Sequence, residues 1–141
     1  MREILFKGKR IDNGEWVEGC YAECNGKTFI GIDISIYGDI FEVFCTPVIR
    51  WLEVDPETLC QFTGETDKNG KRIWESDVVW LVYDGKEHIY QIVWDNSELD
   101  FKATNGEENY GSNFEYLLCC DEIEVIGNIF DNPELLQEEH R

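Results

Sequence analysis

Basic residues are scarce in this sequence. Its 141 residues include 12 lysines and arginines against 30 aspartates and glutamates, so the net charge is −18. The imbalance lies late in the chain, because residues 1–50 hold 8 acids and 6 bases whereas residues 51–141 hold 22 and 6. A protein that binds DNA or RNA directly needs lysine and arginine to displace counterions from phosphates. We therefore expect no direct binding of nucleic acid, and a charge that mainly provides solubility.

The sequence also lacks a long apolar run. Spanning a bilayer takes roughly 20 apolar residues, and no stretch approaches that length. The first stretch, MREILFKGKRID, interleaves charged and apolar residues and does not have the pattern of a signal peptide. These features predict no membrane contact and a cytoplasmic location, where the six cysteines would be reduced.

Residues suited to catalysis or metal binding are few. The only histidines are His88 and His140, and no two cysteines have the C-x2-C spacing of zinc sites. Gly-Lys-Thr at 26–28 ends like a phosphate-binding loop, but Tyr21 replaces the earlier glycine that such a loop needs. The sequence therefore predicts no catalytic residues, no metal and no cofactor, and hence a protein that is not an enzyme.

Turn signals, in contrast, are abundant. Asn-Gly occurs four times, and this dipeptide suits the positive φ angles of tight hairpin turns. Apolar residues alternate or cluster in short runs between the turns, which is typical of strands. The prediction is an all-β fold with an antiparallel sheet over residues 1–55 and a small barrel over residues 56–132. Pro133 favours a helix start, so residues 133–141 are predicted to form a short helix, which Asn132 could cap.

The stretch QFTGETDKNGKRIWESDVV, residues 61–79, raises a separate question because it is highly polar between two apolar runs. Its simplest interpretation is architectural: a tight turn at Asn69-Gly70, with Asp67 accepting bonds from backbone amides. The alternative is a binding site for a small anionic ligand. Three bases, Lys68, Lys71 and Arg72, stand beside the aromatic ring of Trp74, on which a nucleotide base could stack.

The same stretch, together with DEIEVIGNIFDNPELL at 121–136 and REILFKGKRIDNGEWVEG at the N-terminus, resembles the YopX-like proteins of bacteriophages and prophages. The resemblance extends over nearly the whole chain. It implies a phage-encoded protein of the bacterial host cytoplasm, mostly β, whose barrel is SH3-like, and it supplies no catalytic residues. Glu65 and Ser76 depart from the usual pattern, since an apolar residue and a glycine are commoner there. Ser76 leaves open the turn geometry before Asp77, because serine disfavours positive φ.

These features lead to one main functional hypothesis and one alternative. The main hypothesis is a non-enzymatic accessory or binding protein that self-associates as a homo-oligomer, with Trp74, Leu135 and Leu136 as candidate contacts. Because so short a helix is marginal by itself, the two leucines should dock on the barrel or on a neighbouring subunit, and docking within their own chain is the favoured alternative. The alternative is an acidic decoy against host defence, whose partner is a host protein or a small anionic ligand. It would act either as a nucleic-acid mimic, with Glu122 and Glu124 imitating phosphates, or as a sink for a signalling nucleotide.

Overall fold

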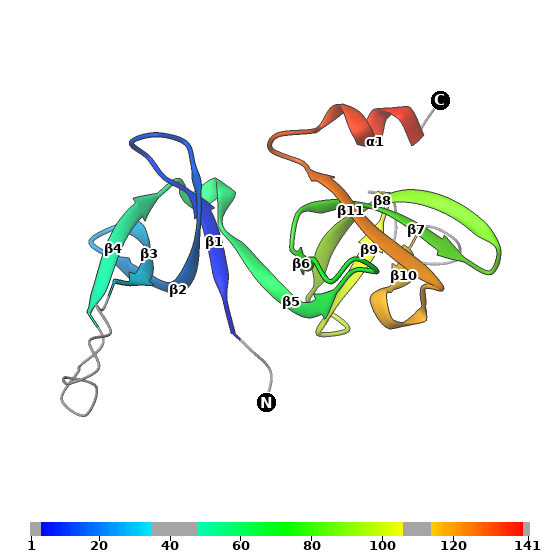
Figure 1. The fold of residues 1–141 in the computed structure, drawn as a ribbon, viewed down its shortest axis with the longest axis horizontal. Coiled ribbons are helices and arrows are strands. Elements are labelled where there is room, and N and C mark those ends of the chain that lie inside the picture. The colour runs from blue at the N-terminus through cyan, green and yellow to red at the C-terminus, as the bar shows by residue number, and fades with distance from the viewer. Residues whose placement is uncertain (1–3, 35–47, 106–113, 140–141) are drawn as a thin grey trace. The chain divides into compact units, whose positions relative to one another are not determined.

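We describe the protein from a computed structural model, which describes residues 4–34, 48–105 and 114–139. The chain divides into two compact units, residues 3–61 and 62–141, and each is described by itself (Figure 1). The described residues contain eleven strands and one α-helix, and the strand pairings are antiparallel. The predicted all-β class is therefore confirmed.

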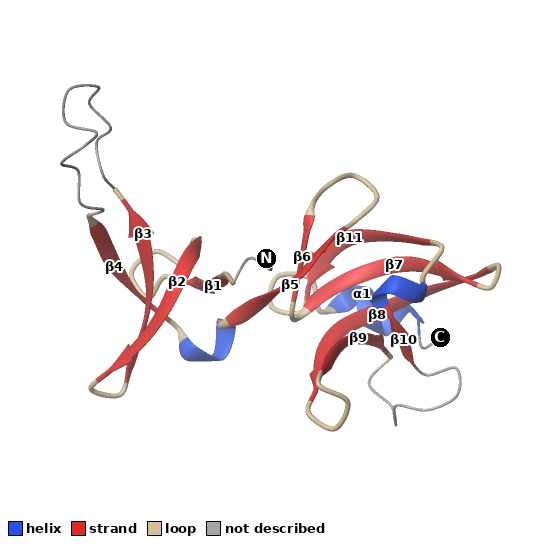
Figure 2. Cartoon of the chain, turned by 90° about the horizontal axis from the view of Figure 1, so that it is seen from below, coloured by secondary structure: helices blue, strands red, loops and turns tan. Residues whose placement is uncertain are grey.

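The first unit is a meander of four strands followed by a 3₁₀ helix. Its elements are β1 (Phe6–Lys9), β2 (Trp16–Cys24), β3 (Lys27–Asp33), β4 (Ile49–Val54) and η1 (Pro56–Thr58), and the strands pair in the order β1-β2-β3-β4 (Figure 2). Asn25 and Gly26 join β2 to β3 with φ angles of 52° and 76°. These are the positive angles that the Asn-Gly signal predicts for a two-residue hairpin.

The sheet of the first unit curls so that the end of β4 returns to β1. Ile11 donates its N–H to the Glu53 carbonyl at 3.1 Å, and Asp55 donates to the Lys9 carbonyl at 2.8 Å. A side chain at Gly8 would collide with Val54, since a Cβ built there lies 2.9 Å from its Cγ2. Glycine at this position therefore allows the two strand ends to close over a small interior, whose buried members include Thr28, Ile30, Leu52 and Val54.

Strand β5 (Cys60–Thr66) begins in the first unit, where it pairs with β1, and continues into the second. There it pairs with β6 (Arg72–Trp74). A five-stranded sheet follows in the order β10-β9-β8-β7-β11. Its members are β7 (Asp77–Tyr83), β8 (Lys86–Asp95), β9 (Asp100–Thr104), β10 (Phe114–Tyr116) and β11 (Glu122–Asn128), with the 3₁₀ helix η3 (Leu117–Cys119) between the last two. The SH3-like closure of this unit stays a prediction.

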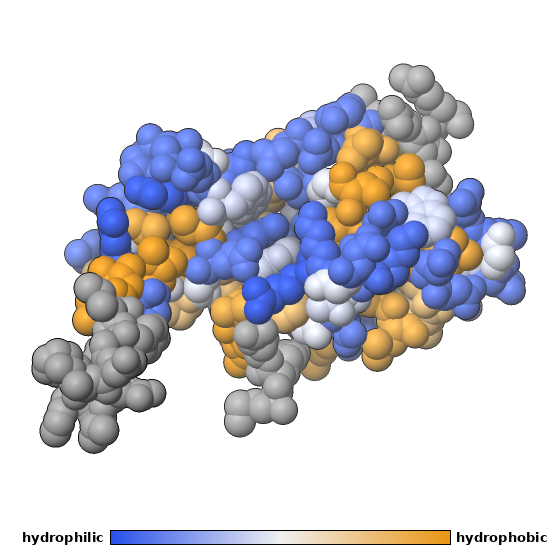
Figure 3. Space-filling view, in the orientation of Figure 1, coloured by the Kyte–Doolittle hydropathy of each residue, from blue (hydrophilic) through white to orange (hydrophobic). Residues whose placement is uncertain are grey.

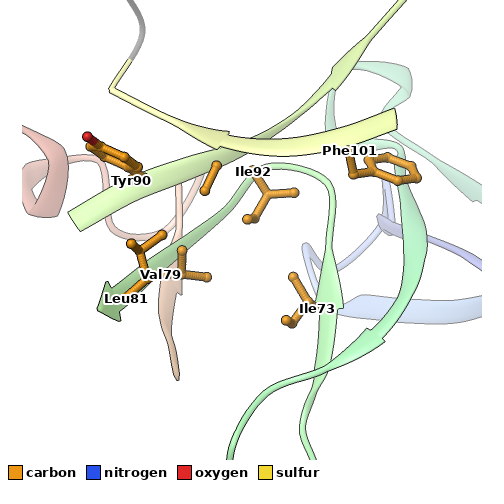
Figure 4. Packing of buried hydrophobic residues seen from close by; sticks show 7 residues of the cluster. Ile73, Val79, Leu81, Tyr90, Ile92 and Phe101 are labelled. Carbon is orange, nitrogen blue, oxygen red and sulfur yellow. The ribbon is translucent and has the colours of Figure 1, made fainter. Parts of the chain in front are cut away.

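One face of this sheet forms the core of the second unit (Figure 4). Strands β7, β8 and β9 each contribute alternate residues, as the two-residue period of a strand requires, and β6 contributes one. The buried cluster consists of Ile73, Val79, Leu81, Tyr90, Ile92, Phe101 and Ala103. Complete burial of each large apolar side chain stabilises the unit by about 1.5–3 kcal/mol, so this cluster holds the sheet together.

The C-terminal helix α1 (Glu134–Glu139) begins one residue after Pro133. The side chain of Asn132, the predicted cap, is directed to the preceding strand, where its Oδ1 accepts the Asn128 N–H at 3.3 Å. Gly127 leaves room for this side chain, since a Cβ there would lie 2.5 Å from Asn132 Oδ1. The loop between β11 and α1 is thus fixed to the strand that precedes it.

Candidate functional site

The polar stretch before β6 forms a tight turn that is fastened to β11. Asp67 is 7% exposed, and its Oδ1 accepts the N–H groups of Asn69 and Lys71, both at 2.9 Å. Its Oδ2 accepts the N–H of Val125 at 3.0 Å, across 58 residues of sequence. Burial would raise the pKa of Asp67, but the three amides outweigh burial and lower it. Asp67 is therefore the charged anchor of this turn.

The predicted basic residues lie together on this turn but point to different partners. The Lys68 Nζ lies 3.9 Å from Glu124 Oε2 and 4.9 Å from the centre of the Trp80 ring. Lys71 and Arg72 are exposed, and the Arg72 guanidinium lies 5.5 Å from the centre of the Phe62 ring. Lys68 and Arg72 thus direct their positive charges to partners within the second unit.

Trp74, the aromatic member of the predicted ligand site, lies inside the second unit. It is 4% exposed, and its ring packs at 5.5 Å from the ring of Phe62. Its backbone N–H donates to Asp77 Oδ2 at 2.8 Å. In this arrangement the indole presents no free face for a nucleotide base or for a second copy of the chain.

The other predicted contact residues are partly covered or partly paired. Leu135 and Leu136 are half-buried on α1, which lies against β8. Glu122 is exposed on β11, but Glu124 accepts a bond from Asn69 Nδ2 at 3.3 Å in addition to its ion pair. Of the two acids proposed as phosphate mimics, one is therefore already held by the turn.

The second unit also buries a lysine, which sequence reasoning did not single out. Lys102 of β9 is 0% exposed, and its Nζ donates to Asp95 and Glu98, each at 2.9 Å. Tyr116 of β10 covers it, with the ring centre 5.3 Å from Nζ, and donates its hydroxyl proton to Glu98. Two carboxylates, Asp95 at the end of β8 and Glu98 in the turn that follows, thus compensate one buried ammonium.

The protonation states of this network follow from its hydrogen bonds. Burial alone would lower the pKa of Lys102, but the bonds to Glu98 and Asp95 outweigh burial and raise it. The Ser97 hydroxyl and the Lys102 ammonium hold the pKa of Asp95 far below its usual range. A lysine that acts as a nucleophile or base needs a lowered pKa. Lys102 has the opposite shift, so the network serves stability.

The first unit exposes apolar side chains instead. The strand residues that alternate with its buried interior point away from it and form the outer face. Its apolar members are Cys20, Ala22, Phe29, Gly31, Ile49 and Trp51, and Lys27, Asp33 and Glu53 lie on the same face. Trp51 is 47% exposed and Ile49 38%. A Cβ at Gly31 would lie 2.7–2.9 Å from Ile49, Trp51 and Cys20. Glycine therefore lets these three side chains converge, and Figure 3 shows apolar atoms gathered over this part of the unit.

A hollow of about 290 Å³ follows the line where β1 and β4 meet. Arg10 and Arg50 are on its walls beside Trp51, and Arg10 is paired with Asp12 at 2.6 Å. Its complete lining is Arg10, Ile11, Asp12, Arg50, Trp51, Leu52 and Glu53. The sequence signal that could have identified it is the adjacent Arg50-Trp51 pair at the start of a strand.

Among the residues that the structure describes, cysteines and metal-binding groups have no arrangement that points to chemistry. Cys60 is buried, Cys20, Cys24 and Cys119 are exposed, and none of these forms a disulfide. Cys45 lies outside the described residues. Within the described ranges, no group of three or more His, Cys, Asp and Glu side chains could hold a metal ion. The helical part of those ranges also contains no segment long and apolar enough to cross a membrane.

Comparison with known proteins supports the architecture. The profile of the YopX protein family matches residues 6–137. The crystal structure of protein EF1440 from Enterococcus faecalis superposes with a TM-score of 0.57, at 20% sequence identity, over 96% of this chain and 99% of that one. At this identity the likeness is one of fold. A sequence comparison with curated proteins finds no match.

Proposed function

Because this chain belongs to the YopX protein family, we propose that it is a phage- or prophage-encoded accessory protein that acts by binding rather than by catalysis. Its place of action is the cytoplasm of the bacterial host. The support for binding is chemical: Asp95, whose pKa is strongly lowered, and Lys102 compensate each other inside the second unit. Active sites usually leave such groups open to a substrate.

The binding partner that the surface favours best is a second copy of the chain. The observation that carries this proposal is the outer face of the first unit, where Trp51 is 47% exposed above Gly31. Partly exposed tryptophans are enriched among the residues that dominate protein interfaces. The apolar residues of this face carry no charge, and Glu53 on the same face lies 3.9 Å from Lys27, whereas residues 62–141 hold 19 acids and 6 bases. Two copies therefore meet with least repulsion through their first units.

The alternative functions receive less support from the geometry. A nucleotide sink at Lys68, Lys71 and Arg72 would need the indole of Trp74, which is packed on Phe62. A nucleic-acid mimic built on β11 would have Glu124 partly neutralised by Lys68. Self-association through the first unit requires neither the release of Trp74 from Phe62 nor the release of Glu124 from Lys68. It is therefore the function that we propose.

Sedimentation velocity over a micromolar concentration series tests the proposal. The wild-type chain should form an oligomer, and Trp51→Ser should shift it toward monomer by about 30-fold in dissociation constant, which corresponds to a loss of about 2 kcal/mol. Association should strengthen as salt screens the net charge of −18. The matched control is Leu118→Ser, which removes an 81% exposed apolar side chain from the second unit. A monomeric wild type, or equal effects of both variants, would overturn the proposal.

A further inference from the structure

Strand β4 has one edge that is paired along only part of its length. On one side it pairs with β3 from Ile49 to Val54. On the other side, only its end is occupied, where Glu53 accepts the Ile11 N–H and Asp55 donates to Lys9. Within the described part of the first unit, no strand continues this pairing toward Ile49. The edge formed by residues 49–52 is therefore open.

The direction of the backbone groups along this edge follows from the bonds that are made. Glu53 and Asp55 point their bonding groups toward β1, whereas the Val48 carbonyl accepts from Ile34 on the β3 side. Backbone groups alternate between the two sides of a strand with a period of two residues. Ile49 and Trp51 therefore direct their N–H and C=O groups to the open side. Four hydrogen-bonding groups are available there for an added strand.

We propose that this open edge binds an extended peptide segment of a different protein, which adds to β4 as a further strand and carries an acidic side chain opposite Arg50. Strand addition of this kind draws its affinity from main-chain hydrogen bonds and its specificity from alternate side chains. The proposal concerns the backbone edge of β4, whereas self-association uses the outer face of the sheet, which the apolar residues of an added strand would border.

Charge decides the chemistry of the peptide. Arg50 is exposed and forms no hydrogen bond or ion pair with the described residues, and its side chain lines the hollow beside Arg10. A carboxylate on the added strand would enter this hollow and receive charge-assisted bonds from the guanidinium. The peptide residues on either side of the acid would lie opposite Ile49 and Trp51, which favour apolar side chains. The expected pattern is apolar, acidic, apolar in an extended segment.

The same reasoning disfavours a second copy at this edge. Two identical antiparallel strands related by a two-fold axis keep their faces, so Trp51 can lie opposite Ile49 or opposite the other Trp51. The pairing of Trp51 with Trp51 sets Ile49 against Glu53, whose carbonyl already accepts from Ile11. The pairing of Trp51 with Ile49 uses all four free groups but sets Arg50 directly against Arg50. Like charges in directly opposed positions are destabilising.

The test uses the full chain and a displayed library of random heptapeptides. Sorting should enrich peptides with Asp or Glu between two apolar residues, and their affinities are then measured by fluorescence anisotropy. Arg50→Glu should weaken binding of these peptides by about tenfold or more, and changing the peptide acid to lysine should restore binding to that variant. Arg72→Glu, an exposed arginine of the second unit, is the control and should bind like the wild type.

Two further measurements identify how the peptide is held. Methylation of the peptide nitrogens that face Ile49 and Trp51 should abolish binding if the peptide adds as a strand. Retained binding would show side-chain capture alone and overturn the proposal, as would a library without acidic enrichment. If an added peptide instead dissociates the oligomer, a second copy occupies the edge, which also overturns it. Loss of self-association with peptide binding intact would contradict only the function proposed above.

Discussion

The two units differ in the exposure of one unusual residue each. The first exposes a tryptophan, Trp51 at 47%, and the second buries a lysine, Lys102 at 0%. The buried charge is fully compensated by Asp95 and Glu98 of its own unit, so it belongs to the architecture. The exposed indole and the edge beside it have backbone and side-chain groups that remain available. The difference is the reason why we propose the first unit, and not the second, as the surface for partners.

The largest effect should come from removing the buried ammonium. Lys102→Met leaves Asp95 beside an apolar side chain with its main cationic partner missing, and breaking a buried ion pair in this way costs about 3–5 kcal/mol. We expect that loss in the free energy of unfolding, measured by urea denaturation at neutral pH. A variant as stable as the wild type would contradict the contrast between the two units, because the buried Lys102 would then not stabilise the second unit.

The matched control is Lys68→Met. This lysine is 40% exposed and lies 3.9 Å from Glu124, so its replacement should change the stability by less than about 1 kcal/mol. Equal losses of unfolding free energy in the two variants would show that the burial of Lys102 does not make its ion pairs more stabilising than that of Lys68.

A smaller loss should follow from releasing the turn that is anchored on β11. Asp67→Ala leaves the N–H groups of Asn69, Lys71 and Val125 without their acceptor. Because an unsatisfied buried donor costs about 1–3 kcal/mol and the turn is partly solvated, we expect a loss of about 2–3 kcal/mol in unfolding free energy. Asp12→Ala, at an exposed carboxylate of the first unit, is the control and should leave the urea midpoint unchanged.

The pH dependence of the same variant sharpens this prediction. The pKa of Asp67 is lower in the folded state, because the backbone amides outweigh the effect of burial. Its contribution is therefore fully present above the unfolded pKa of about 3.9 and is lost as the pH falls through the folded value. The difference in stability between wild type and Asp67→Ala should shrink between neutral pH and acid. A constant difference would mean that the charge of Asp67 is not what holds the turn.

Local signals in the sequence were sufficient for some of the turns but not for the surfaces. At Asn13-Gly14 and Asn69-Gly70 only the glycine has a positive φ. Asn25-Gly26 and Asp84-Gly85 form tight hairpins with positive φ at both residues, because turn chemistry depends on the two residues themselves. Trp74 and Trp51 both follow an arginine-containing strand start, yet only Trp74 is covered, by Phe62. The burial of Lys102 likewise depends on Tyr116 of another strand. Whether a side chain is covered depends on distant segments, which the local pattern does not specify.

The smallest expected effect is a gain in stability at Ser76, between β6 and β7. This residue has φ of 73°, and it is fixed there because its N–H donates to Ile92 at 2.8 Å and its carbonyl accepts from Ile129 at 3.0 Å. The left-handed conformation costs a side-chain-bearing residue about 1–2 kcal/mol, whereas glycine adopts it freely but loses more chain entropy on folding. Ser76→Gly should therefore raise the free energy of unfolding by about 0.5–1 kcal/mol.

Ser76→Ala retains the conformational cost and should give no gain, so calorimetric unfolding of the two variants separates backbone strain from loss of the hydroxyl. Equal stability of the glycine and alanine variants would show that the strain is released elsewhere in the second unit.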